Sequence, residues 1–224
     1  MSIELPPLAL RPKIIGLGHA CDVAYQIRRI THDETAYFYD WLMTPQHSCN
    51  LMDIDWDNFL TSKNWNLSDD ARGVIDRATG IEFRHQFKWI SNSSDLIDEA
   101  LVEGQLAQAK EKFLYLRNVT LTAIRSKNYV YLIRRDSFES PDDAMLAAEK
   151  ILSAYLKLNP LIRLIIVSPH AVSETFTPYY IFVKSKLRPA TDTGWWCGED
   201  NSWNRVLNLA HNWFQFHKFK DIQI

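Results

Sequence analysis

The sequence predicts an α/β fold of three layers, in which helices cover both faces of a mostly parallel or mixed central sheet. Segments with the pattern of strands alternate along the chain with segments that have the 3.6-residue period of helices. Two of the expected strands are continuously apolar, which is typical of strands that are buried on both faces. The composition, 46% hydrophobic and 23% charged, is that of an ordinary globular protein.

We expect a single α/β domain over residues 1–224. A chain of this size can bury roughly 70% of its unfolded surface in one core. No segment rich in glycine, serine or proline marks a domain boundary, and the sequence has no internal repeat.

The chain opens on a strand, a tight turn and a helix. Residues 13–17 form a short apolar run, and Gly18 with His19 makes the turn. A helix is expected over residues 20–30, because its apolar side chains recur at the spacing of one helix face. Four residues share that face: Ala20, Val23, Ala24 and Ile27.

The next part of the chain contains two more expected strands. The first covers residues 36–40, and residues 45–80 that follow are polar and irregular, with a short helix around residues 57–61. Apolar and polar residues alternate strictly over residues 80–89, which predicts a strand. Since His85 belongs to the apolar set, we expect its side chain on the inward face of that strand.

The rest of the chain alternates long helices with short strands. One helix has clear end signals, because Ser140 is a preferred N-cap residue, a proline follows it, and Asn159-Pro160 stops the helix. This helix is expected to bury Met145 among its apolar side chains. The other expected helices cover residues 94–117 and 202–216, and the expected strands cover residues 129–133, 161–167 and 179–183.

Charge and targeting signals exclude several classes of protein. Lys and Arg number 25 against 27 Asp and Glu, and they are scattered, so no nucleic-acid or membrane-surface partner is expected. Residues 1–12 lack the pattern of a signal peptide, and no run of about 18 apolar residues predicts a membrane span. Cys21, Cys49 and Cys197 are too few and too widely spaced for a disulfide framework, which favours a cytoplasmic protein with reduced thiols.

Cys21 is the first candidate for a reactive group. It lies in the opening turn of the first expected helix, where free N–H groups and the helix dipole stabilise an anion and can lower the pKa of a thiol. It also lies off the apolar stripe of that helix, on a side shared with Tyr25 and Arg28. The alternative is a buried structural cysteine, which is the commonest fate of a free cysteine.

A thiol nucleophile needs a base and a group that orients the base. Among seven histidines, His85 is favoured, because burial among aromatic residues can tune its pKa. Asp40, at the end of one expected strand, and Asp136, just after another, are the candidates to orient the imidazole. The alternative for His85 is a core histidine with satisfied hydrogen bonds.

Four segments form an ordered set of motifs. They are Ile14-Ile-Gly-Leu-Gly-His-Ala-Cys-Asp-Val-Ala-Tyr-Gln-Ile-Arg-Arg29, Tyr39-Asp-Trp41, Phe83-Arg-His-Gln-Phe87 and Trp196-Cys-Gly-Glu-Asp-Asn-Ser-Trp203. In this order they resemble the landmarks of a bacterial family of unknown function described as papain-like cysteine peptidases. The resemblance implies that Cys21 is the nucleophile and His85 the base. A papain fold combines a helical half with an antiparallel half, whereas the alternating pattern of this chain predicts an α/β sandwich.

Nucleotide binding is a rival interpretation of the first turn. The spacing Gly16-x-Gly18-x-x-Cys21, with Asp40 some twenty residues later, imitates a dinucleotide-binding fingerprint. The third glycine of that fingerprint, which allows close helix packing, is replaced by Cys21.

A metal site is a second rival. His19-x-Cys21 and His47-x-Cys49 supply four potential zinc ligands. Because their spacing matches no common zinc module, we expect neither a metal nor a cofactor.

The leading hypothesis is therefore a thiol-dependent hydrolase or acyl transferase that acts on an unknown peptide or acyl substrate. Cys21 attacks a carbonyl, backbone amides near Gly18 to Asp22 hold the oxyanion, and His85, oriented by Asp40, transfers the proton. The alternative is a Rossmann-like nucleotide-binding or non-catalytic module, and the sequence leaves the oligomeric state open. The C-terminal tryptophans are expected to be core and helix-packing residues: Trp195, Trp196, Trp203 and Trp213.

Overall fold

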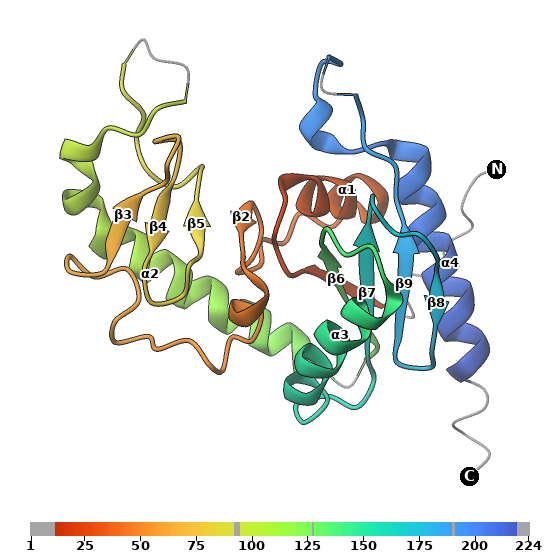
Figure 1. Ribbon diagram of the computed structural model, residues 1–224. Coiled ribbons are helices and arrows are strands. Elements are labelled where there is room, and N and C mark those ends of the chain that lie inside the picture. Colours follow the sequence, from red (N-terminus) through yellow and green to blue (C-terminus); the bar gives the residue numbers. More distant parts are fainter. Residues whose placement is uncertain (1–11, 92–94, 127, 190, 219–224) are drawn as a thin grey trace.

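A computed structural model of the chain describes residues 12–91, 95–126, 128–189 and 191–218 (Figure 1). The expectation that no signal peptide opens the chain falls almost wholly on residues 1–11, outside the described part. The described residues form a five-stranded sheet in the order β1-β6-β7-β9-β8 and a four-stranded sheet in the order β2-β5-β4-β3. No helix among them is long and apolar enough to cross a membrane.

The five-stranded sheet is mixed and mostly parallel, which confirms the predicted α/β fold. Strands β1, β6, β7 and β9 run parallel in consecutive pairs, and β8 pairs antiparallel with β9. The register places Leu132 of β6 opposite Ile15 of β1 and Leu164 of β7. The strand bounds are β1 (Lys13–Gly16), β6 (Val130–Arg135), β7 (Ile162–Ser168), β8 (Thr175–Phe176) and β9 (Tyr180–Lys184).

Helices cover both faces of this sheet, as predicted. Successive residues of each strand point to opposite faces. Ile133 and Ile165 pack with α1 (Cys21–Thr31) and α4 (Asp200–Lys218), and these residues share one hydrophobic cluster. The alternate residues of the same strands join a second cluster with α3 (Pro141–Tyr155) and α2 (Glu99–Ile124).

The end signals of α3 act as the sequence predicts. The Ser140 hydroxyl accepts a hydrogen bond from the backbone N–H of Asp143, and Pro141 is the first helical residue. Met145, however, is 40% exposed, and Ala147 takes the buried position instead. Elsewhere, α1, α4 and the strands β6, β7 and β9 lie within a residue or two of their expected bounds.

The four-stranded antiparallel sheet was not expected, because its sequence is polar and its strands are very short. Buried Asp76 helps to hold this segment together. Its carboxylate accepts a hydrogen bond from the N–H of Thr79, which closes the turn after β4, and one from the N–H of Leu60, which links an earlier turn to that strand. The sheet packs on α2 through a cluster of phenylalanines. Its strands are β2 (Leu42–Met43), β3 (Trp65–Leu67), β4 (Val74–Asp76) and β5 (Glu82–Phe83).

Four expected elements need correction. Residues 36–40 form a turn rather than a strand, because the Asp40 carboxylate accepts a hydrogen bond from the backbone N–H of Tyr37. Residues 57–61 are also a turn and not a helix.

The other two corrections concern bounds and orientation. The strand expected over residues 80–89 is limited to β5 and one isolated bridge at Trp89, so His85 lies in a bend and is exposed rather than inward-facing. The helix expected from Ser94, which is outside the described residues, begins in the structure at Glu99 and continues to Ile124.

Candidate functional site

The turn between β1 and α1 positions Cys21 as the first residue of its helix. Gly18 and His19 both have left-handed backbone, with φ of 75° and 79°. Only glycine fits at position 18, because a Cβ there would meet the Thr44 hydroxyl and lie 2.9 Å from the carbonyl oxygen of Leu42. The N–H of His19 donates to that same carbonyl at 3.1 Å, so the segment around β2 fixes the turn.

The structure brings Cys21 and His85 together. The Sγ atom of Cys21 lies 3.6 Å from Nε2 of His85, although the two residues are 64 positions apart. Cys21 follows a strand of the five-stranded sheet, and His85 follows β5 of the four-stranded sheet. The pair therefore forms where the two sheets meet.

Both members of the pair favour their neutral forms. Burial, and then the Asp22 carboxylate, raise the pKa of the Cys21 thiol above its ordinary value. This differs from the expected lowering of the thiol pKa, because burial and a neighbouring carboxylate both disfavour the thiolate. His85 has much of its surface in solvent, yet partial burial and the Arg84 charge lower the pKa of its imidazole. At neutral pH the pair is a thiol beside an uncharged imidazole.

Neither aspartate that we proposed as the orienting group reaches His85. Asp40 accepts a hydrogen bond from Arg28 at 2.7 Å, and Asp136 accepts one from buried Arg134 at 2.8 Å. Asp95 is the carboxylate whose charge acts on His85, and it opposes the fall in the imidazole pKa. Asp95 comes after β5 in the sequence, and an antiparallel bridge joins Trp89 to Ile97 on either side of it.

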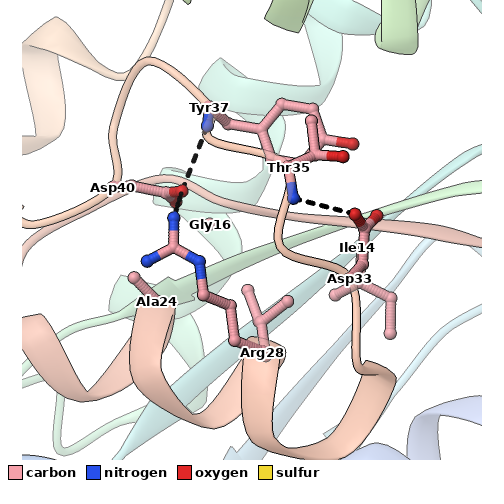
Figure 2. Close-up of a pocket in the computed structure, with 9 residues that line it drawn as sticks. Ile14, Gly16, Ala24, Arg28, Asp33, Thr35, Tyr37 and Asp40 are labelled. Atoms are coloured by element: carbon pink, nitrogen blue, oxygen red, sulfur yellow. Dashed lines mark hydrogen bonds and ion pairs between the residues drawn. The ribbon is translucent and has the colours of Figure 1, made fainter.

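Asp40 serves a different part of the site (Figure 2). Its carboxylate lies in a hollow of about 10 Å³, and burial raises its pKa to about 6 despite the Arg28 charge. Arg28 also lies over the ring of Trp41, 5.4 Å from its centroid. Trp41 has φ of 65°, an uncommon backbone for a bulky residue. The Asp40–Arg28 pair therefore positions Trp41 rather than the imidazole.

Four aromatic side chains form a series of ring contacts that includes His85, and we call Tyr25, Trp41, Trp89 and Trp196 the aromatic cradle. Trp41 and Trp89 lie 6.2 and 6.4 Å from the His85 ring, measured between centroids. Trp196 contacts Trp41 at 6.0 Å and Tyr25 at 5.5 Å. The expectation that Trp196 is a packing residue is thus wrong, since it is 44% exposed, whereas Trp203 is buried as expected. The side chain of Trp195 lies outside the described residues.

The segment around Cys197 is fastened to α1 by two residues of the first motif. Buried Gln26 donates to the carbonyl of Cys197 at 2.7 Å and to Asp200 at 2.8 Å. Arg29 donates to Asn204 at 2.7 Å. The first and last motifs therefore contact each other in the folded protein.

The two rival interpretations find little support. In dinucleotide-binding folds the first strand lies inside the sheet, and the strand order reverses there. Here β1 lies at the edge of the sheet, and the other parallel strands, β6, β7 and β9, follow it on one side only. Among the described residues, no group of three or more His, Cys, Asp or Glu side chains is placed to hold a metal ion. Cys49 is buried, with its Sγ 2.8 Å from a guanidinium nitrogen of Arg134.

Comparisons with known proteins found no relative. No family model, no curated protein and no solved structure matches the chain. The resemblance to papain-like cysteine peptidases therefore stays a prediction.

Proposed function

We propose that this chain is a thiol-dependent hydrolase or acyl transferase, with Cys21 as the nucleophile and His85 as the base. The observation that supports the proposal is the 3.6 Å separation of Sγ and Nε2. A histidine within reach of a thiol can act as its base, which is the pairing that nucleophilic cysteines use.

The neutral state of the pair determines how the reaction would begin. His85 takes the thiol proton on Nε2 as the sulfur of Cys21 attacks a carbonyl carbon, and the carbonyl oxygen becomes an oxyanion. The intermediate collapses to a thioester, and the leaving group departs with the proton from His85. Water then cleaves the thioester in a hydrolase, or a second nucleophile takes the acyl group in a transferase.

The first turn of α1 supplies donors for the oxyanion. The first backbone N–H groups of a helix have no intrahelical acceptor, and here they belong to Cys21 and its neighbours. Donors of this kind act on the charge that develops in the transition state. We therefore place the carbonyl oxygen of the substrate against the N–H groups of Cys21 and Asp22.

We also propose a cellular compartment and a substrate class for the protein. All three cysteines are free thiols, which supports a reducing, cytoplasmic location. The substrate class is a peptide or another acyl compound, and we propose no cofactor, nucleic-acid partner or membrane partner.

The test is acylation by a p-nitrophenyl ester, followed as nitrophenolate release across the pH range. We expect the wild-type rate to rise with pH through a midpoint below 6.5, because burial lowers the pKa of the His85 base. Without the base the reaction needs thiolate, so the His85→Ala rate should fall by about 10²-fold or more near pH 7, with its midpoint above about 8.5.

Two variants complete the test. Cys21→Ser should keep the far-UV circular dichroism of the wild type and lose acylation. His170→Ala, which changes an exposed histidine, should leave the rate and its midpoint unaltered. Equal rates and equal midpoints for wild type and His85→Ala would contradict the proposal.

A further inference from the structure

We infer that the aromatic cradle binds a neutral aromatic group of the substrate beside the Cys21 thiol. This inference rests on the proposed function, because it names the kind of group that the Cys21–His85 pair would act next to. It adds a binding site, formed by Tyr25, Trp41, Trp89 and Trp196, to the reacting atoms.

The position of the cradle is the first argument. Two of its rings contact His85 itself, and a third, Trp196, contacts Trp41 in an edge arrangement. Tyr25 lies one helical turn after Cys21 in α1 and continues the ring contacts to Trp196. A group attached to a carbonyl at the sulfur would therefore be surrounded by these rings.

Exposure is the second argument. Trp89 is 45% exposed and Trp196 is 44% exposed, whereas Trp203, which packs in the core, is 1% exposed. Clustered exposed aromatic surface marks interaction sites more often than isolated exposed residues do. The contacts among these rings and with His85 are T-shaped, and an added aromatic ring can join such a cluster by the same edge-to-face geometry.

Preorganisation is the third argument. Trp41 is held in a left-handed backbone conformation, which persists only where the surroundings determine it. Here the Arg28 guanidinium covers its ring and bonds to Asp40 at 2.7 Å. Trp196 precedes Cys197, whose carbonyl is fixed by buried Gln26. Rings that are already fixed lose little conformational freedom when they bind a ligand.

The charged side chains near the pair are already joined in ion pairs. Arg84 is paired with Glu82 at 2.8 Å, and Asp22 with Arg135 at 2.6 Å. Arg28, which covers Trp41, bonds to Asp40 at 2.7 Å. A charged ligand group would have to compete with these ion pairs, whereas a neutral group would not. Of the ligands that stack on tryptophan, a neutral aromatic group fits best.

The experiment compares methanethiosulfonate reagents that differ only in the transferred group. In each, the Cys21 thiolate attacks the outer sulfur of the reagent, the S–S bond breaks, methanesulfinate leaves, and a mixed disulfide forms. Benzyl, methyl and trimethylammonioethyl reagents are used, and the rate at Cys21 is followed by peptide mass mapping so that Cys49 and Cys197 are scored separately. Each rate is divided by the rate of the same reagent with free 2-mercaptoethanol.

We expect the normalised benzyl rate to exceed the methyl rate by about tenfold or more, since apolar pockets discriminate on this scale. Trp196→Ala and Trp89→Ala should each reduce this ratio severalfold, and Trp196→Phe should restore most of it. Phe216→Ala, which removes an exposed aromatic ring at the far end of α4, should keep the wild-type ratio.

Three results would overturn the inference: a benzyl-to-methyl ratio near one, a ratio that both tryptophan variants leave unaltered, or a cationic reagent that reacts fastest.

Failure of the proposed function gives a different combination of results. If His85→Ala acylates as fast as the wild type but the benzyl preference persists, the thiol is not activated and the aromatic cradle still stands. If acylation depends on His85 but the preference is missing, only the cradle is excluded.

Discussion

The carboxylate of Asp40 is almost fully enclosed between α1 and the turn that precedes β2. An aspartate in this setting would be expected to have a low pKa, because its partner Arg28 lies at 2.7 Å. Burial is the larger effect, and the pKa of Asp40 is raised to about 6. The folded protein therefore binds a proton at this position that the unfolded chain has already released.

This proton makes stability depend on pH. Because the folded pKa exceeds the unfolded value of about 3.9, Asp40 favours the folded state at low pH, and that contribution is lost as the pH rises toward 6. The wild type should lose about 2 kcal/mol of unfolding free energy relative to Asp40→Asn between pH 4.5 and 7. Urea unfolding of both proteins at these two pH values measures the difference, and a constant difference would contradict the raised pKa.

At this scale the sequence predicted which two candidate residues lie together better than it predicted their surroundings. Cys21 and His85 were selected from the helix position and from aromatic neighbours, and they lie in contact. The orienting carboxylate was misplaced, because an aspartate at the end of a segment reveals nothing about which residue it faces. The charge of Asp95 raises the pKa of His85, and the bridge between Trp89 and Ile97 holds their two segments near each other. No local sequence pattern indicates this proximity.

Among the helices, α1 makes the most varied contacts. Its first turn holds Cys21 and also Asp22, which is paired with Arg135 at 2.6 Å. Its middle holds Gln26, whose amide donates to the 195–200 segment and accepts from Arg29. The helix thus links the thiol, the sheet and the segment that carries Trp196.

Removing the Gln26 amide should therefore weaken the fold. Gln26→Ala leaves the Cys197 carbonyl without its donor, and we expect a loss of about 1–3 kcal/mol in unfolding free energy. Gln108→Ala, on the exposed side of α2, is the matched control and should change stability by less than about 0.5 kcal/mol. Denaturant titration of the three proteins gives the comparison, and equal effects of the two substitutions would contradict the role of Gln26.

Elements with strong local signals were predicted well, as α3 shows with its serine cap and following proline. Strands β2, β3 and β4 were missed because they contain only two or three residues each, too few to show a period-2 pattern. The carboxylate of buried Asp76 accepts hydrogen bonds from Thr79, three residues later, and from Leu60, sixteen residues earlier, and the second of these has no local signal.

Across the whole molecule, one hydrophobic cluster extends from the four-stranded sheet to the five-stranded sheet. Phe113 of α2 is central to it, with ring centroids 4.9 Å from Phe83 and 5.6 Å from Phe38. The same cluster includes Leu132 and Leu164 of the larger sheet. A shared core of this kind favours a single cooperative unit among the described residues, and the single domain expected over residues 1–224 stays a prediction.

Substitution of Phe113 tests that cooperativity. Phe113→Ala should lower the unfolding free energy by about 3–5 kcal/mol, because the ring is buried and its cavity cannot fill completely. Far-UV circular dichroism and tryptophan fluorescence should move together to the same lower midpoint. Exposed Phe216→Ala should leave the midpoint nearly unaltered, and separate transitions for the two probes would indicate two domains.

The layered α/β part of the fold could be predicted because alternating apolar segments determine it locally. How the second sheet packs beside it could not, since that depends on aromatic contacts such as Phe59 with Phe83, which no periodicity reveals.

The parallel pairing of β1 with β6 also bears on synthesis at the ribosome. Lys13 pairs with Val130, so the first strand has no neighbour in its sheet until more than half of the polypeptide has been translated. Both Cys21 and His85 are synthesised well before β6, on a nascent chain that cannot yet hold their side chains together. Such distant pairings form late and slowly. The contact between Cys21 and His85 should accordingly form only after β6 has been released, so acylation assisted by the imidazole is expected only from the folded chain.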